Sequence, residues 1–313
     1  MKTKSGNNCV IKVNKMGSSY SLEQAVAEPA PVRLKPVPQQ QFVKYQHTGT
    51  YTKWSVGWIQ DLDSKEGKQQ LLLECKPMVM LFLASPGEGK STAARSCLVA
   101  YADVQYFRGQ IKWISPTSEL NIDTDCLPAS GRLGPTENEM KNKKLDRQKI
   151  TKRKLNDWIT DLIHKGEQAK KDGTQMPPSL LYIEDGTGWI GREGDDALAR
   201  IKDIYTHLNL TIMYIGHYYT AVIPSIRANA SMIFALGNLD ETHWKGMHKS
   251  FAMLLRVING GKYHVEKEFM KLICYQCINH GALLFRKTHK HKDVLRFKSK
   301  NVEAGTFKIP ESM

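Results

Sequence analysis

Long apolar runs are missing from this chain of 313 residues, and their absence sets the first limits on its class. No segment approaches the roughly 20 apolar residues that a membrane-spanning helix needs, so we expect no membrane association. The N-terminus has no hydrophobic segment behind it, which argues against a secretory signal. The six cysteines are mostly scattered. This usage is typical of a reduced, intracellular protein and not of a disulfide framework.

Acidic residues are also few in relation to basic ones. The chain has 45 Lys and Arg against 31 Asp and Glu, a formal net charge of +14 and a pI of about 9.4. This excess favours a polyanionic partner, although a basic protein with a well-solvated surface would have the same composition. The length allows one sizeable α/β core and a smaller appendage.

The most informative segment present is Ala84–Thr92, with the sequence Ala-Ser-Pro-Gly-Glu-Gly-Lys-Ser-Thr. The apolar run 78–83 before it predicts a strand, and residues 93–101 after it predict a helix. A strand, a glycine-containing loop closed by Gly-Lys-Ser and a helix form the phosphate-binding loop of nucleoside triphosphatases. Ala84 stands where the first glycine of this pattern is usual. A Gly/Pro-rich turn is the alternative, but both flanks have the type and length of a phosphate-binding loop.

We expect this loop to bind ATP with Mg²⁺. Gly87 and Gly89 would supply unusual backbone angles, and N–H groups of the loop and the helix N-terminus would wrap the phosphates. Lys90 would reach the β- and γ-phosphates, and the Ser91 hydroxyl would ligate Mg²⁺. The predicted nucleotide-binding residues are consecutive and lead from the loop into the helix: Ser85, Pro86, Gly87, Glu88, Gly89, Lys90, Ser91 and Thr92.

Short apolar runs alternate with helical patterns through the middle of the chain. Further strands are predicted at 109–116, 179–183, 211–215 and 231–236. Helical signals are a capping box between Thr136 and Glu139, an apolar face within 155–163 and an apolar side within 195–205. This alternation predicts an α/β fold of the P-loop type, with a parallel sheet flanked by helices on both faces.

Composition divides the chain into three predicted parts. Residues 1–50 would form a proline-rich tail or linker, because their prolines favour extended geometry over a packed core. Residues 51–240 would form the P-loop ATPase core, and residues 241–313 a basic C-terminal extension.

An acidic motif follows the strand predicted at 179–183. The segment Leu180–Asp185 places two carboxylates at the end of a buried strand, where ligands bind in open α/β sheets. By position, Glu184 would hold Mg²⁺ through water and Asp185 would polarise the attacking water. The roles could be reversed, because side-chain direction alternates along a strand. An ordinary acidic strand end is the alternative, and the upstream phosphate loop disfavours it.

Two further catalytic candidates follow the strand predicted at 211–215. His217 could be a sensor that hydrogen-bonds phosphate or water, or a structural histidine. Arg227 could reach the γ-phosphate in a neighbouring subunit and stabilise transition-state charge, or be a structural arginine. Arg192 and Arg200 are rivals for the same role.

Three segments together resemble one family: Ala84–Thr92, Leu180–Asp185 and, most specifically, His207–Phe234. Over roughly residues 76–240 the chain resembles the poxvirus-type genome-packaging ATPases of the FtsK–HerA superfamily, which occur in double-jelly-roll DNA viruses. The resemblance implies a homo-oligomeric ring that pulls double-stranded DNA into a preformed capsid. Its implied partners are DNA and capsid or packaging-vertex proteins, and its implied location is the virion or the host-cell interior.

The chain departs from this family at three points. Gly216 and His217 stand where family members usually carry Thr or Ser followed by Gln. The acid pair begins with Glu184, whereas the family usually has Asp-Asp or Asp-Glu. Thr206 stands where an arginine often precedes the His-Leu-Asn stretch.

Two basic runs, at 141–154 and 286–300, lie outside these motifs. Either could follow DNA phosphates without reading sequence, as a motor on DNA requires. The first could instead be a solvated helix face or a nuclear-targeting patch.

Cys274 and Cys277 show a fragment of zinc-ligand spacing, with His280, His289 and His291 beyond them. Only one Cys pair is present and the histidine spacing is irregular. A strand in which both cysteines are small apolar residues is therefore favoured over a structural zinc site.

Three functions compete. The first is an ATP-driven translocase that packages viral DNA. The second is another DNA-pumping ATPase of the same superfamily, or a helicase; membrane spans or a DNA-reading domain would favour it, and neither is evident in the sequence. The third is a nucleotide-gated scaffold that binds capsid or DNA and hydrolyses ATP slowly. It remains an alternative because Glu184 precedes Asp185 and because His217 replaces the usual residue of the family.

Overall fold

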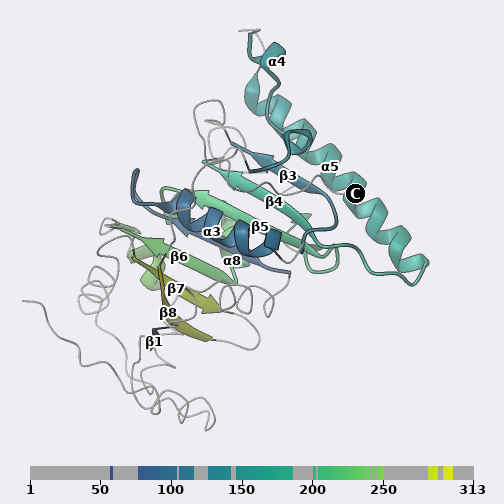
Figure 1. The fold of residues 1–313 in the computed structure, drawn as a ribbon. Coiled ribbons are helices and arrows are strands. Elements are labelled where there is room, and N and C mark those ends of the chain that lie inside the picture. The colour runs from purple at the N-terminus through teal and green to yellow at the C-terminus, as the bar shows by residue number, and fades with distance from the viewer. Residues whose placement is uncertain are drawn as a thin grey trace, which may run out of the picture. The chain divides into compact units, whose positions relative to one another are not determined.

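A computed structural model describes part of the chain (Figure 1). The described residues are 57–58, 77–103, 106–115, 126–141, 146–185, 200–201, 204–237, 239, 242–243, 245–249, 281–287 and 292–298. The predicted tail 1–50, Arg192 and the Cys274/Cys277 pair lie outside the described residues, as does most of the helix predicted at 195–205.

One mostly parallel sheet organises the fold (Figure 1). Its spatial order is β1-β8-β7-β6-β2-β5-β4-β3, and β7 alone runs antiparallel to both of its neighbours. The strands are β1 (Gly57–Trp58), β2 (Val79–Leu83), β3 (Ile111–Ile114), β4 (Ser179–Glu184), β5 (Leu210–Gly216), β6 (Met232–Leu236), β7 (Gly281–Lys287) and β8 (Lys292–Lys298). Strand β2, which precedes the glycine loop, lies centrally between β5 and β6.

Helices cover both faces of this sheet. The α-helices are α3 (Lys90–Asp103), α4 (Glu137–Lys141), α5 (Arg147–Lys171) and α8 (Pro224–Ala228), with 3-10 turns η3 (Ala129–Gly131) and η4 (Tyr219–Ala221). Alternate residues of β2 point to opposite faces: Leu81 packs in a cluster with Leu155 of α5, and Phe82 packs in a second cluster with Cys97 of α3. Strands buried on both faces explain why these runs are continuously apolar. The predicted α/β fold with a two-sided parallel sheet is confirmed.

Each predicted strand of the core is present, and α5 buries the predicted apolar face that includes Leu155, Trp158 and Ile159. Three further strands, β1, β7 and β8, are additional to the five predicted and extend the sheet beyond β6. Among the described residues, no helix is long and apolar enough to span a membrane.

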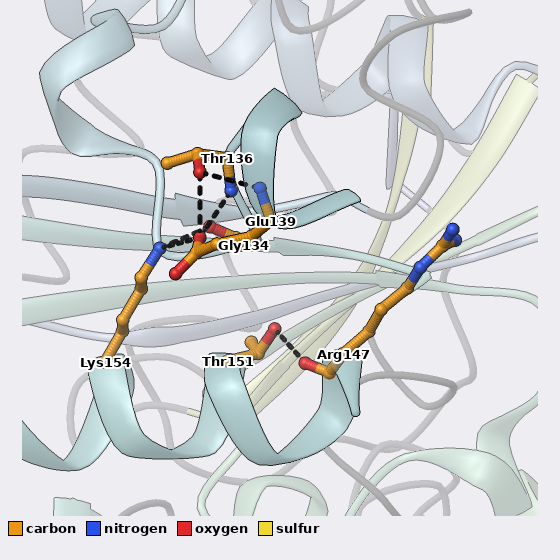
Figure 2. Close-up of polar contacts among 6 residues, drawn as sticks. All are labelled: Gly134, Thr136, Glu139, Arg147, Thr151 and Lys154. Atoms are coloured by element: carbon orange, nitrogen blue, oxygen red, sulfur yellow. Dashed lines mark hydrogen bonds and ion pairs between the residues drawn. The ribbon is translucent and has the colours of Figure 1, made fainter. Parts of the chain in front are cut away.

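The predicted capping box forms at α4 (Figure 2). The Thr136 N–H donates to Glu139 Oε2 at 2.7 Å, and the Glu139 N–H donates to Thr136 Oγ1 at 3.3 Å. The same carboxylate accepts from Lys154 Nζ of α5 at 2.8 Å, and this ammonium also donates to the Gly134 carbonyl at 3.2 Å. The Lys154 ammonium and the Thr136 N–H lower the pKa of Glu139 to about 2. Glu139 therefore ties α4 to α5.

Glu139→Gln is expected to lower the free energy of unfolding by about 1 kcal/mol at neutral pH, because the variant loses the ion pair and weakens the cap. A carboxylate with a lowered pKa in the folded state stabilises the fold above its ordinary pKa, and this contribution is lost as pH falls. The difference in free energy of unfolding between the wild type and the variant should therefore decrease as the pH falls from 4.5 to 2. Urea unfolding at several pH values measures this difference. Glu167→Gln, at an exposed position of α5, is the control, and a gap independent of pH would contradict the prediction.

Candidate functional site

The loop between β2 and α3 has the backbone of a phosphate-binding turn. Gly87 and Gly89 have φ values of +80° and +84°. A Cβ at either position would meet nothing within 4 Å, so the left-handed backbone, and not lack of space, requires glycine there. The Ala93 N–H donates to the Gly89 carbonyl at 2.9 Å, which begins the ladder of α3. The amides of residues 90–92, the first three of α3, have no intrahelical partner and can bind an anion.

Lys90 is the first residue of α3 and is only 8% exposed. The described residues provide neither a hydrogen bond nor an ion pair for its ammonium. The N-terminus of a helix favours an anion, and a cationic side chain there adds to this preference. The position of Lys90 at the end of a glycine loop and the start of a helix therefore favours a phosphate ligand.

The next residue connects the loop to the acidic motif. The Ser91 hydroxyl donates to Glu184 Oε1 at 2.7 Å, across 93 positions of sequence. The Ser115 hydroxyl, directly after β3, donates to Glu184 Oε2 at 3.3 Å. Glu184 is 1% exposed, and both oxygens of its buried carboxylate accept a hydrogen bond from a serine hydroxyl. The two residues predicted to hold Mg²⁺ thus lie in contact. Ser115 was not predicted; its hydroxyl at the end of a predicted strand was the available signal.

Asp185 takes a different conformation from its neighbour. Its φ of +45° lies in the left-handed region, which aspartate tolerates better than most residues and which is concentrated at functional sites. The Asp185 N–H still donates to the Ile215 carbonyl of β5 at 2.9 Å. Because of this backbone, the Asp185 side chain does not follow the alternating side-chain directions of β4. The two carboxylates therefore have separate surroundings.

His217 faces Asp185. Its Nε2 lies 3.2 Å from Asp185 Oδ1, and the two side chains are 30% and 27% exposed. This contact is an ion pair only when the imidazole is protonated. His217 and Asp185, both predicted as site residues, thus lie in contact after the ends of β5 and β4.

A buried tyrosine lies in the same region. Tyr214 of β5 is 1% exposed, and its hydroxyl has no hydrogen-bond partner among the described residues. Burial, and to a smaller extent the negative charge of Asp185, raises the pKa of Tyr214. Tyr214 was not predicted as a site residue, because a tyrosine within an apolar strand has the pattern of a core residue.

Arg227 lies on α8 and folds back onto its own chain. Its Nη1 donates to the Tyr219 carbonyl at 3.2 Å, and its guanidinium lies 5.1 Å from the centre of the Tyr219 ring. Of its rivals, Arg200 is exposed. In the structure Arg227 therefore rests on Tyr219, and Arg192 lies outside the described residues.

A cavity of about 690 Å³ lies at the opposite edge of the sheet, between the C-terminal half of α5 and the residues before β5. Lys170, His207 and Asn209 line it, and none of the predicted site residues does. Within the described ranges, no cluster of three or more Asp, Glu, His or Cys could hold a metal ion. The carboxyl edge, with Lys90, Ser91 and the acid pair, is the stronger candidate because its polar groups converge.

The fold and the site together define an α/β protein with a mostly parallel sheet and a glycine loop between β2 and α3. No family model and no curated protein matches the chain. Among solved structures it is similar to the genome packaging NTPase B204 from Sulfolobus turreted icosahedral virus 2 in complex with AMPPCP, with 9% identity, a TM-score of 0.43, and coverage of 72% of this chain and 98% of that one.

Two other solved structures are similar at the same level. EssC (ATPases 2 and 3) from Geobacillus thermodenitrificans has 12% identity and a TM-score of 0.45, covering 72% of this chain and 40% of that one. The pCW3 conjugation coupling protein TcpA with ATPγS has 10% identity and a TM-score of 0.44, covering 74% of this chain and 62% of that one. Likeness at this level identifies neither a family nor an activity.

Proposed function

We propose that the protein is an ATPase whose active site is the carboxyl edge of β2, β4 and β5. The hydrogen bond from Ser91 to Glu184 carries the proposal, since it joins the phosphate-binding turn to the acidic motif at 2.7 Å. Lys90, the first residue of α3, lies at the end of the glycine loop beside this contact, and its cationic side chain supports an anionic ligand.

The donor set fits Mg²⁺ bound with the nucleotide. A serine hydroxyl and a carboxylate in contact are hard oxygen ligands of the kind that Mg²⁺ takes beside phosphates. Ser91 would be a direct ligand, and Glu184 would hold the ion through water. Bound there, Mg²⁺ would neutralise charge on the β- and γ-phosphates.

The residues of this chain would divide the remaining work. Lys90 and the loop amides would bind and orient the phosphates. Asp185, held outside the pair of serine hydroxyls, would accept a hydrogen bond from the attacking water and polarise it. His217 lies beside Asp185 and would orient it, or respond to the γ-phosphate.

We propose Arg227 as a finger that acts on the nucleotide of a neighbouring subunit. A guanidinium can stabilise charge spread over phosphate oxygens in the transition state. In the structure this group rests on Tyr219, so the proposal requires it to leave that carbonyl and ring when subunits assemble.

The specific role that we propose is translocation of double-stranded DNA into a viral capsid by a homo-oligomeric ring. The segments Ala84–Thr92, Leu180–Asp185 and His207–Phe234, which resemble packaging ATPases, and the net charge of +14 support it. ATP turnover measured with and without duplex DNA tests the proposal. Strong stimulation by duplex supports the motor, strand separation would indicate a helicase, and absence of turnover would indicate a scaffold.

The N-terminal part of α5 is the surface that we propose for DNA phosphates. Arg147, Lys149 and Arg153 are exposed there, and α5 has no acidic residue in its first turn. The C-terminus of α5, at Lys171, lies shortly before the start of β4 in the chain (Figure 1). The N-terminus of α5 therefore lies toward the carboxyl ends of the strands, where the candidate site is. With 25 residues it is about 37 Å long, against about 20 Å for β4, and so extends beyond the strands.

One residue of each basic run is unsuited to binding DNA. Arg286 of β7, in the second run, is only 5% exposed. Lys154, in the first run, is already paired with Glu139.

A triple variant, Arg147→Gln, Lys149→Gln and Arg153→Gln, should raise the duplex concentration for half-maximal stimulation about tenfold or more. Basal turnover should be unchanged. Each lost phosphate contact should reduce the slope of log affinity against log salt by about 0.9. The control replaces three exposed lysines of the same helix, Lys165, Lys170 and Lys171, with Gln. If both triple variants weaken stimulation equally, overall charge and not this surface attracts DNA.

A further inference from the structure

Three buried polar atoms surround the end of β5 without a hydrogen-bond partner among the described residues: the Tyr214 hydroxyl, Asp185 Oδ1 and His217 Nδ1. Asp185 Oδ1 lies 3.2 Å from His217 Nε2, close enough for an ion pair but not aligned as a hydrogen bond. Buried polar groups almost always have a partner, in protein or in ordered water. A bound water near the end of β5 would supply such a partner.

The path of the Tyr214 ring aims its hydroxyl at this region. Tyr214 and Gly216 lie on the same face of β5, two residues apart. A Cβ at Gly216 would lie 3.0 Å from Cε1 and 3.6 Å from Cδ1 of Tyr214, so the ring lies over the glycine. The hydroxyl therefore extends toward the carboxyl end of β5. Asp185 lies at that level, since its N–H donates to the Ile215 carbonyl.

Gly216 acquires a specific role from this geometry. Any larger residue at 216 would compete with the Tyr214 ring for the same space. The glycine thus leaves room for a hydroxyl supplied from two residues upstream. The influence of the Asp185 charge on Tyr214 agrees with this proximity.

We propose that Tyr214 is a positioning residue for Asp185: through a bound water, its hydroxyl orients the carboxylate that polarises the attacking water. Gly216 permits this arrangement by giving up its side-chain space. The inference rests on the proposed ATPase function and adds to it a residue that contacts neither phosphate nor metal.

Tyr214→Phe tests the inference, because it removes the hydroxyl and keeps the ring. We expect kcat to fall about tenfold, the value of one hydrogen bond in the transition state. KM for ATP and the Kd of ATPγS should stay within about twofold, since the phosphate-binding loop is untouched. Tyr101→Phe is the matched control: Tyr101 is also 1% exposed, but its hydroxyl lies against the sulfurs of Met78 and Met80 in the cluster that contains α3. It should leave kcat unchanged.

A second variant separates positioning from packing. Gly216→Ala should displace the Tyr214 ring and lower kcat in the wild-type background. In the Tyr214→Phe background the same change should lower kcat no further, because no hydroxyl remains to be displaced. Additive losses would overturn the inference, as would a Tyr214→Phe enzyme with wild-type kcat. A wild type without any turnover would overturn the ATPase proposal itself and this role with it.

Discussion

Lys90→Ala is expected to abolish ATP turnover, with a loss of about 10³-fold or more, and to weaken ATPγS binding by about 10- to 100-fold. We expect the ammonium to bring a full positive charge to the β- and γ-phosphates, and charge-assisted hydrogen bonds of this kind are the strong ones. Thermal stability without nucleotide should be retained, because the lost group acts on the ligand. Turnover assays, nucleotide titration and thermal unfolding measure the three effects.

Lys112→Ala is the matched control for this variant. Lys112 of β3 is also partly buried, and burial, followed by repulsion from Lys165, lowers its pKa. Its ammonium donates to the Ser130 carbonyl at 3.2 Å, so it has a structural partner that Lys90 lacks. The control should lose stability and keep turnover. Normal turnover in Lys90→Ala would refute the assignment of the phosphate-binding loop.

The core of the fold could be predicted because its strands are buried on both faces. Runs such as Val79–Leu83 and Met232–Leu236 are continuously apolar, and this pattern has few interpretations when turns and helices separate the runs. The strands beyond β6 were harder to predict. Strand β7 reads Gly-Ala-Leu-Leu-Phe-Arg-Lys, and its basic end attracted a DNA-binding interpretation although Arg286 is buried. Burial of a charged residue depends on tertiary neighbours that the local pattern does not contain.

The candidate site was predictable as a set of residues but not as an arrangement. Ser91 and Glu184 were assigned to one metal site from their motifs, and they lie in contact. The contact of the Ser115 hydroxyl with Glu184 and that of His217 with Asp185 each join strands that are distant in sequence. Sequence could not decide which acid serves which role, since both follow one strand. The serine hydroxyls on Glu184 supply the physical reason to separate the two.

Glu184→Gln and Asp185→Asn should therefore fail in different ways. Glu184→Gln keeps the volume of a side chain that is 1% exposed, but it removes the charge beside the Ser91 hydroxyl. We expect a rise of about tenfold or more in the Mg²⁺ concentration for half-maximal turnover, with partial recovery at high Mg²⁺. The buried hydroxyls can rotate to accept from the new amide, so folding should be retained.

Asp185→Asn should leave Mg²⁺ and nucleotide binding intact and lower turnover by about 10²- to 10⁴-fold, the usual contribution of a general base. Added Mg²⁺ should not restore it, and the bound nucleotide should be recovered as ATP, not ADP, after acid quench. Asp157→Asn, at an exposed position of α5, controls for loss of an acidic charge. If Glu184→Gln and Asp185→Asn show the same Mg²⁺ dependence and the same bound nucleotide, the division of labour between the two carboxylates is wrong. A reversal of the two results would exchange their roles, and Tyr214 and His217 would then orient the metal-holding acid.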